Sequence, residues 1–417
     1  MPASERRVVV AWTLYDFGNS AFAAIIQATV FPVFFASAVV GNAEGRGDFW
    51  WGLMGSTAMG LVAVSSPLLG GIADHAGVRK PLLVGFTLVS VAATALLATL
   101  EPGMLVRGFI LGVTAMVSYE VAFVYYNSYL PRIAPPHRMG RVSAAGFAVG
   151  YFGSLVAFLV AYPLLGAQAY WACFITAAAQ FLIFALPAFL LLPADTRHGI
   201  PFLTAVGRGA RETRATLREI LTDPERAQLK RFLTAYFVYE DGVNTVIAFS
   251  AIFAGKTLGF TLPETIGLFM VVQVTALIGS AAWAKPTDLR GPRFVILITL
   301  VQWTLVTVLA YFVTAKWQFW VVAVLAGTGL GAIQAASRAF MARLVPAGRE
   351  AEFFGFYSLV GKTGAIAGPI VFGMVSWLMG GDQRTAILTV GLFFLVGGLL
   401  LRRVTAGGPA ERALAEA

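Results

Sequence analysis

The sequence predicts an all-α membrane protein with twelve transmembrane helices, arranged as two pseudo-symmetric halves of six. Three observations predict this fold class. Of the 417 residues, 58% are hydrophobic and only 12% are charged, whereas about 25% of residues are charged in a typical soluble protein. Apolar runs that can cross a hydrocarbon core of about 30 Å recur along the chain. Three short polar motifs also occur twice, once in each half of the sequence.

The spans follow from the apolar runs, because a transmembrane helix needs about 20 predominantly apolar residues. The first run follows Arg6 and Arg7 and is too long for the core of a signal peptide, so it is predicted to remain as a span. Twelve runs meet the criterion: 11–40, 50–73, 81–100, 104–130, 143–165, 169–192, 231–254, 264–284, 294–313, 317–339, 352–379 and 384–402.

One long polar break divides the spans into two groups. The predicted domains are an N-terminal six-helix bundle at 1–192 and a C-terminal six-helix bundle at 231–403. Residues 193–230 between them are expected to form a cytoplasmic linker, and residues 404–417 a disordered tail.

The linker has an internal pattern of its own. Apolar residues recur at near-helical spacing among arginines, which is typical of an amphipathic helix at a membrane interface. A regulatory or lipid-sensing helix is the alternative. Asp223 and Pro224 are then predicted to cap the start of the seventh span. The apolar positions are Leu203, Val206, Ala210, Leu217, Ile220 and Leu221.

The basic residues predict the orientation of the spans. Most of the 30 Lys and Arg residues lie in breaks on the same side as the N-terminus. Because cytoplasmic loops are enriched in Lys and Arg, both termini and the linker are predicted to be cytoplasmic. This asymmetry explains the net charge of +9 without a nucleic-acid partner. Basic residues on the opposite side are Arg46, Arg107, Lys256, Lys316 and Arg384.

The repeated motifs indicate that the second half of the chain is a parallel copy of the first. Such repeats place a solute site near the membrane midplane, between the two halves. The three motif pairs are D-x-x-N-S/T at Asp16 and Asp241, D-x-x-G-x-R at Asp74 and Asp288, and R-x-x-P-x-x-R at Arg132 and Arg343.

These motifs carry a family resemblance. The stretch from Gly70 to Lys80, GGIADHAGVRK, resembles the loop between the second and third spans of the major facilitator superfamily. His75 stands where that pattern has a basic residue, and the second copy lacks the upstream glycines. The resemblance implies a twelve-helix transporter that works by alternating access.

A narrower resemblance covers nearly the whole chain. The stretches YDFGNSAF at 15–22, YNSYLP at 126–131, GKT at 361–363 and Gly368-Pro369 are similar to the "unknown major facilitator" family. That family includes vacuolar amino-acid effluxers linked to autophagy in fungi. The resemblance therefore implies an amino acid or a similar zwitterion as the solute.

Charged residues inside spans are costly and mark functional sites by default. On a helix with about 3.6 residues per turn, Asp16 shares one face with a polar stripe in the first span. The alternative is that these groups pair with cations or cap broken helices, and Glu240 is expected simply to face the interface. Candidates for solute or proton binding are Asp16, Asn19, Ser20, Gln27, Tyr119, Glu120, Asn127, Asp241, Asn244, Thr245 and Lys362.

Lys362 is the one basic residue predicted inside a span. Gly361-Lys362-Thr363 ends like a P-loop, but Phe356 replaces the required glycine, so nucleotide binding is rejected. As a buried cation, Lys362 is expected to neutralise Asp16 or Glu120, or to hold a carboxylate of the solute.

A second group of residues is predicted to control gating. An Asp at a helix end can interact with a neighbouring helix N-terminus and with nearby arginines, locking one conformation. The alternative is a loop charge that only sets topology, and for Arg338 a lipid-headgroup contact. The gating candidates are Asp74, Gly77, Arg79, Arg138, Asp288, Arg293 and Arg338.

The predicted function is secondary active transport of a small solute across a bacterial inner membrane, by a monomer. Proton coupling through a carboxylate is expected, because His75, His137 and His198 all lie in polar breaks. A lipid-like or sugar-like solute, or a receptor or assembly role, are the alternatives. No enzyme motif, cofactor site or metal site is predicted, and Cys173 is the only cysteine.

Overall fold

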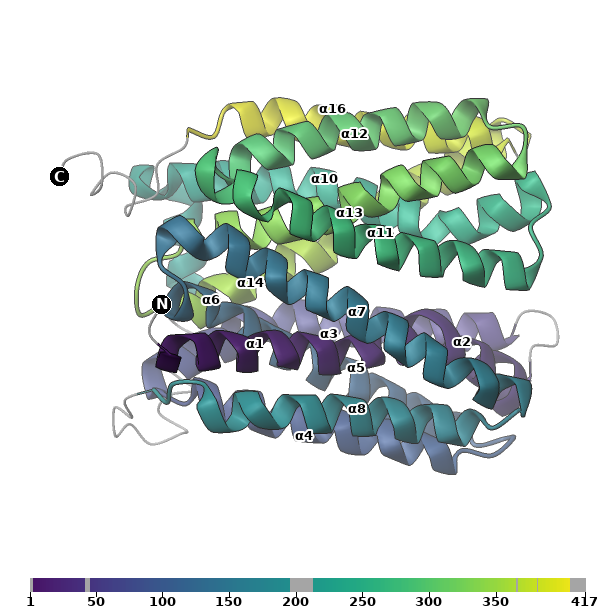
Figure 1. Ribbon diagram of the computed structural model, residues 1–417, viewed down its shortest axis with the longest axis horizontal. Coiled ribbons are helices and arrows are strands. Elements are labelled where there is room, and N and C mark those ends of the chain that lie inside the picture. The colour runs from purple at the N-terminus through teal and green to yellow at the C-terminus, as the bar shows by residue number, and fades with distance from the viewer. Residues whose placement is uncertain (1–2, 42–45, 196–212, 365–366, 381, 406–417) are drawn as a thin grey trace. The chain divides into compact units, whose positions relative to one another are not determined.

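The computed structural model describes residues 3–41, 46–195, 213–364, 367–380 and 382–405. These residues are almost entirely helical, and no strand occurs among them. The helices run roughly parallel to one long direction within each part of the chain (Figure 1).

The described residues form twelve long helical segments, as the sequence predicts. The first is continuous through α1 (Ala3–Phe22), η1 (Ala23–Thr29), α2 (Val30–Val33) and η2 (Phe34–Val40). The next five are α3 (Arg46–Ala76), α4 (Arg79–Leu96), α5 (Leu105–Ser128), α7 (Met139–Gly166) and α8 (Tyr170–Leu191). The last six are α10 (Ala227–Ile252), α11 (Leu262–Leu289), α12 (Pro292–Phe312), α13 (Lys316–Leu344), the pair α14 (Glu350–Thr363) and α15 (Ala367–Leu378), and α16 (Gln383–Arg402).

Among the described segments, ten are long and apolar enough to cross a membrane by composition alone. The other two are α10 and the α14–α15 pair. The middle of α10 carries Glu240 and Asp241, and the eleventh segment is divided between two shorter helices.

The chain packs into two compact units. Unit 1 comprises Met1–Tyr129, Val149–Thr213 and Gly348–Gly355. Inside it, α1 packs along α8, and α5 packs along both α4 and α3.

Unit 2 comprises Leu130–Ala148, Arg214–Ala347 and Phe356–Ala417. Inside it, α13 packs along α11 and α12, and α16 packs along α12 and α10. Short helices α6 (Leu130–Ile133) and η5 (Pro136–Arg138) belong to this unit. The predicted domain boundaries at 192 and 231 stay a prediction.

Glycines allow the helices within each unit to approach closely, as in many membrane bundles. A methyl group added at Gly153 would collide with the backbone carbonyl of Phe17 on α1. In unit 2, a methyl group at Gly331 would collide with the carbonyl of Ala276 on α11. These contacts fix the helix pairs α1–α7 and α11–α13 at short distance.

The first helix of each half widens into π-helix beyond its midpoint. In the first half this occurs in η1 and η2, and in the second half in η7 (Phe253–Thr257). The Thr29 hydroxyl donates to the Ala24 carbonyl at 2.6 Å. π-Helical turns free backbone groups and occur frequently at functional sites.

The structure describes only part of the predicted linker helix, as a helix over 213–222. Ile220 is buried, but Leu217 and Leu221 are about half exposed. Leu203, Val206 and Ala210 lie outside the described residues, as do positions 406–417 of the predicted tail. The predicted cap is confirmed, because Asp223 accepts a 2.9 Å hydrogen bond from the backbone of Glu225 at the start of η6 (Pro224–Arg226).

Candidate functional site

Asp16 lies in the middle of α1 and is 4% exposed. The Tyr126 hydroxyl on α5 donates to its Oδ2 at 3.0 Å, and the Asn19 amide donates to its Oδ1 at 3.4 Å. Gly150 of α7 leaves room for this carboxylate, since an added Cβ would lie 3.4 Å from the Asp16 carboxyl carbon. Asp16 therefore connects three helices of unit 1.

Aromatic rings hold the donor to Asp16 in position. The Tyr126 ring lies between Trp12 and Tyr15, with centroid distances of 4.5 and 4.9 Å. The Trp12 indole donates to the Tyr126 carbonyl at 2.9 Å, and the Tyr15 hydroxyl hydrogen-bonds to Thr87 at 2.7 Å. With both neighbours anchored, the Tyr126 hydroxyl has one preferred direction, toward Asp16.

A second carboxylate of unit 1 lies further along the same helices. Glu120 of α5 is 4% exposed, and the Gln27 amide of η1 donates to its Oε1 at 3.2 Å. Tyr119 is buried and stacks on Phe22 at 4.4 Å, so its ring packs within the unit. Asn127 is also buried on α5.

The predicted polar stripe of the seventh span lies on α10 in unit 2. Both carboxylate oxygens of Asp241 accept from the backbone N–H of Gly368, at 2.9 and 2.8 Å. The Thr245 hydroxyl donates to the Asp241 carbonyl at 2.7 Å, as the Ser20 hydroxyl donates to the Asp16 carbonyl at 2.7 Å. The repeated motif therefore has the same local structure in both halves. Asn244 is half-buried.

Glu240 lies beside Asp241 in this polar region, and the expectation that it simply faces the interface stays a prediction. It is 6% exposed, and the Gln334 amide of α13 donates to its Oε1 at 2.9 Å. Lys362 of α14 is half-buried and interacts electrostatically with Glu240. The expected pairing of Lys362 with Asp16 or Glu120, which belong to unit 1, stays a prediction.

The loop motif of unit 1 forms a buried ion-pair network. The Arg79 guanidinium donates to Asp74 at 2.5 Å, to Glu350 at 2.9 Å and to the Ser128 carbonyl at 3.3 Å. Asp74 also accepts from the backbone N–H of Glu352 at 2.8 Å, in the first turn of α14. This is the interaction expected of a gating aspartate, a carboxylate at a helix N-terminus with an arginine beside it.

Glu350 was not a candidate from the sequence, although it follows the repeated R-x-x-P-x-x-R motif directly. Burial acts to raise the pKa of its carboxyl group, but the Arg79 guanidinium and backbone N–H groups, including that of Gly348, together hold that pKa below its ordinary value. Glu350 is therefore ionised and completes the network around Arg79.

The second copy of the loop motif differs in its arginine. Asp288 accepts from the backbone N–H of Gly140 at 2.8 Å, in the first turn of α7, and pairs with Arg141 at 2.6 Å. Arg293 instead donates to the Arg402 carbonyl at 2.7 Å, at the end of α16. The helix-capping role of the aspartate is thus repeated in unit 2, whereas the Asp–Arg pair within the motif is not.

Glycines in both copies allow the tight turn that the motif needs. Gly77 and Gly291 have φ of +65° and +81°, in the left-handed region that other residues rarely adopt. Arg138 is half-buried in η5 of unit 2.

Arg338 is 1% exposed, which excludes the lipid-headgroup alternative. Its guanidinium donates to the Ser143 hydroxyl at 3.0 Å and to the Ser143 carbonyl at 2.6 Å. It also lies 4.0 Å from the ring centroid of Phe147. Arg338 thus joins α13 to the first turns of α7 within unit 2.

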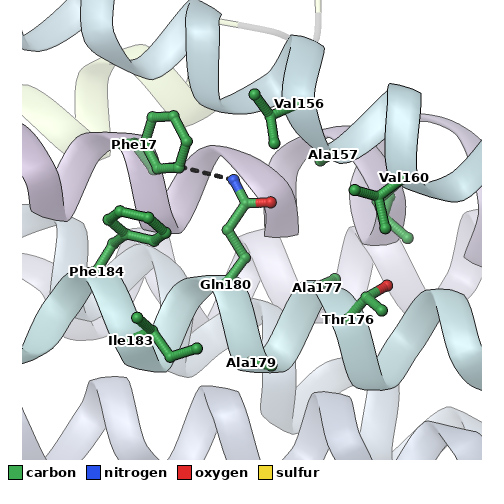
Figure 2. Close-up of a pocket in the computed structure, with 11 residues that line it drawn as sticks. Phe17, Val156, Ala157, Val160, Thr176, Ala177, Ala179, Gln180, Ile183 and Phe184 are labelled. Atoms are coloured by element: carbon green, nitrogen blue, oxygen red, sulfur yellow. Dashed lines mark hydrogen bonds between the residues drawn. The ribbon is translucent and has the colours of Figure 1, made fainter.

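A cavity of about 310 Å³ lies between α1, η1, α7 and α8 in unit 1 (Figure 2). The Gln180 amide points toward α1 and donates to the Phe17 carbonyl at 3.2 Å and to the Gly153 carbonyl at 3.0 Å. The cavity is mainly apolar, and the Gln180 amide group that lines it already donates two hydrogen bonds to backbone carbonyls. The cavity therefore does not suit a zwitterion. The lining residues are Phe17, Ile25, Val156, Ala157, Val160, Thr176, Ala177, Ala179, Gln180, Ile183 and Phe184.

The described residues form twelve long helical segments, ten of which are apolar enough to cross a membrane, and both halves of the chain carry the same polar motifs. With the buried carboxylates, these are the features of a multi-pass membrane transporter of the major facilitator type. The family model described as "Vacuole effluxer Atg22 like" matches residues 53–413, and the chain belongs to this family. The protein is therefore a member of a transporter family.

Relatives with sequence similarity support the same assignment. The chain is 30% identical over 407 residues to the "Uncharacterized MFS-type transporter YxiO" of Bacillus subtilis, covering 94% of this chain and 93% of that one. It is 22% identical over 447 residues to "Autophagy-related protein 22-1" of Neosartorya fischeri, covering 83% and 73%.

Solved structures show the same fold. The human organic anion transporter MFSD10 superposes with a TM-score of 0.78 at 17% identity, over 96% of this chain and all of that one. The proton:xylose symporter XylE superposes with a TM-score of 0.74 at 14% identity, over 97% and 96%. At these identities the similarity is evidence for the fold alone.

Proposed function

We propose that the protein is a secondary transporter of an amino acid or a similar zwitterion in a bacterial plasma membrane, with both termini in the cytoplasm. It works by alternating access and is driven by protons. The observation that carries this proposal is the pair of buried carboxylates in unit 1, Asp16 and Glu120, each hydrogen-bonded to a neutral partner. Ionisable groups inside the spans of a membrane protein mark proton or solute pathways, and these two carboxylates are buried in spans of unit 1.

The charge inventory of the spans supports a zwitterionic solute. Ionisable groups inside a membrane protein mark solute or proton pathways, and they are expensive to keep there without a role. The chain holds buried carboxylates in α1, α5 and α10 and a basic side chain in α14. Both charges of an amino acid can therefore find a partner of opposite sign.

The family relationship also supports an amino acid or a similar zwitterion as the solute. The matching family is described as vacuole effluxers, and relatives in fungi are autophagy-related proteins. A sugar-like solute is the second candidate, since a structural neighbour is a proton:xylose symporter. A lipid-like solute suits the apolar cavity of Figure 2 better than the polar groups on α1, α5 and α10.

Flux through purified protein in proteoliposomes tests the proposal. Vesicles are loaded in parallel with the twenty proteinogenic amino acids, a set of sugars and a set of lysolipids, and counterflow of each labelled solute is measured. Counterflow of one or more amino acids is expected, with none in protein-free vesicles. Counterflow of sugars or lysolipids alone would replace the zwitterion, and no counterflow of any solute would favour a receptor or assembly role.

A further inference from the structure

Each unit joins its first and fourth long helices by a hydrogen bond between a glutamate and a glutamine. In unit 1 the glutamine is on the first helix and the glutamate on the fourth, Gln27 and Glu120, at 3.2 Å. In unit 2 the order is reversed, with Glu240 on α10 and Gln334 on α13, at 2.9 Å. Both units therefore contain a glutamate–glutamine pair between their first and fourth long helices, with the two residue types exchanged between the helices.

Unit 2 adds a cation to its pair. Tyr236 lies one turn before Glu240 on α10, and its ring stacks on Tyr357 of α14 at 4.3 Å. Its hydroxyl lies 2.9 Å from the position that a Cβ of Gly361 would take. This contact brings α14 against α10 at Gly361, the residue before Lys362, one turn of α10 from Glu240.

The repeat shows that this cation is specific to unit 2. Counted from the R-x-x-P-x-x-R motif, the position of unit 1 that corresponds to Gly361 is Gly150, and the one that corresponds to Lys362 is Tyr151. The two units thus share the glycine but differ in the charge of the neighbouring side chain.

We infer that Glu240, Gln334 and Lys362 form a zwitterion-binding subsite within unit 2. Glu240 binds the ammonium group of the solute, Gln334 orients the Glu240 carboxylate, and Lys362 binds the carboxylate of the solute. This inference rests on the proposed function and names the residues that recognise the two charges.

The physical reason is charge compensation. A buried charge is strongly unfavourable unless it is paired. Without solute, Glu240 and Lys362 compensate each other. A zwitterion that enters between them offers each side chain a new partner of opposite sign, so no charge is left uncompensated in either state. An amine or a carboxylic acid offers only one of the two partners.

Ligand binding to purified full-length protein tests this subsite. The probes are the twenty proteinogenic amino acids, and for each amino acid that binds, its decarboxylated amine and its deaminated acid. Wild-type protein is expected to bind the amino acid at least tenfold more tightly than either analogue. Glu240→Gln and Lys362→Met are each expected to weaken amino-acid binding by roughly tenfold to a hundredfold, as for loss of a charge-assisted hydrogen bond.

The two variants are expected to differ in their response to the analogues. Glu240→Gln removes the partner of the ammonium group, so it loses the residual binding of the amine and keeps that of the acid. Lys362→Met has the opposite effect, and Lys362→Arg keeps both. Glu264→Gln and Lys316→Met are the matched controls, because this Glu–Lys pair of unit 2 is 2.7 Å apart and about 40% exposed at the ends of α11 and α13.

The outcomes separate this subsite from the proposed function. Wild-type protein that binds none of the twenty amino acids overturns both. Wild-type protein that binds an amino acid, together with Glu240→Gln and Lys362→Met variants that bind it as tightly as wild type, overturns the subsite alone. If Glu240→Gln fails to fold, the analogue preference of Lys362→Met against Lys362→Arg decides the result.

Discussion

Single side chains explain why buried charges are tolerated in this bundle. Every described carboxylate of the spans on α1, α5 and α10 has a hydrogen-bond donor from another helix: Tyr126 for Asp16, Gln27 for Glu120, Gln334 for Glu240 and the Gly368 backbone for Asp241. The sequence identifies the carboxylates, because charge stands out in an apolar run. It does not identify the partners, because neutral Tyr and Gln are common in spans and lie far away in the chain.

Tyr126→Phe tests one of these buried contacts. It removes the hydroxyl that donates to the Asp16 carboxylate and leaves the ring stack in place. The loss of a hydrogen bond to a buried carboxylate is expected to lower the free energy of unfolding by about 1–3 kcal/mol. Thermal unfolding in detergent measures the change.

Tyr125→Phe is the matched control, because its hydroxyl donates to a neutral group, the Leu69 carbonyl, at 3.1 Å. A smaller loss is expected there, since the acceptor is neutral. The Tyr126→Phe effect should also shrink in an Asp16→Asn background. Equal losses in both backgrounds would show that Tyr126 acts through packing rather than through Asp16.

The ion-pair network around Arg79 predicts a pH dependence. The folded-state pKa of Glu350 is depressed, so its contribution to stability is complete above its ordinary value near 4.5 and is lost as the pH falls through the lower folded-state pKa. Wild-type protein should therefore lose thermal stability below about pH 4.5, and Glu350→Gln should lose less. Glu225→Gln, at an exposed carboxyl group, is the control. A Glu350→Gln variant with the wild-type pH profile would contradict the assignment.

At the scale of helices, the sequence predicts well which helices exist and in which order they follow. It predicts less well where each helix begins and ends. All twelve predicted spans occur as helices among the described residues, because long apolar runs leave no alternative in a membrane. The π-helical turns were not predicted, since local composition does not mark them. The sequence indicates that glycines let helices pack closely, but it does not show which helices pair. The carbonyl that contacts each glycine lies in a distant segment of the chain.

Gly153→Ala tests one such helix pair. The added methyl group collides with the Phe17 carbonyl, so overpacking is expected to destabilise unit 1 by about 1–3 kcal/mol. Gly85→Ala on α4 is the control, because nothing lies within 4 Å of its added Cβ, and its stability should be unchanged or higher. Thermal unfolding of the two variants is compared directly. Equal stability would mean that α1 and α7 separate at no cost.

For the whole molecule, the repeat is the most informative feature of the sequence. It predicts that Asp74 and Asp288 have equivalent surroundings, and each aspartate does cap the first turn of a long helix in its own unit. It fails for Arg293, whose side chain reaches the end of α16 instead of the motif aspartate. Equivalent motifs thus share backbone contacts more faithfully than side-chain pairs.

Cysteine labelling tests the orientation of the molecule in the membrane. In a Cys173→Ser background, single cysteines at Arg46 and Arg384 should react with an impermeant reagent from outside the cell. Cysteines at Arg138 and Arg214 should react only after the membrane is permeabilised, because basic loops are retained in the cytoplasm. External labelling at Arg214 would invert the proposed topology.

The central claim is that a buried carboxylate of unit 1 couples transport to protons. In proteoliposomes with an imposed pH gradient, wild-type protein should accumulate the amino acid identified by counterflow. Glu120→Gln or Asp16→Asn should abolish this accumulation and preserve exchange of solute across the membrane, because only the proton-binding group is lost. Glu101→Gln, at an exposed carboxyl group, should behave as wild type. If Glu120→Gln and Asp16→Asn both still accumulate solute under the gradient, proton coupling through these residues is refuted.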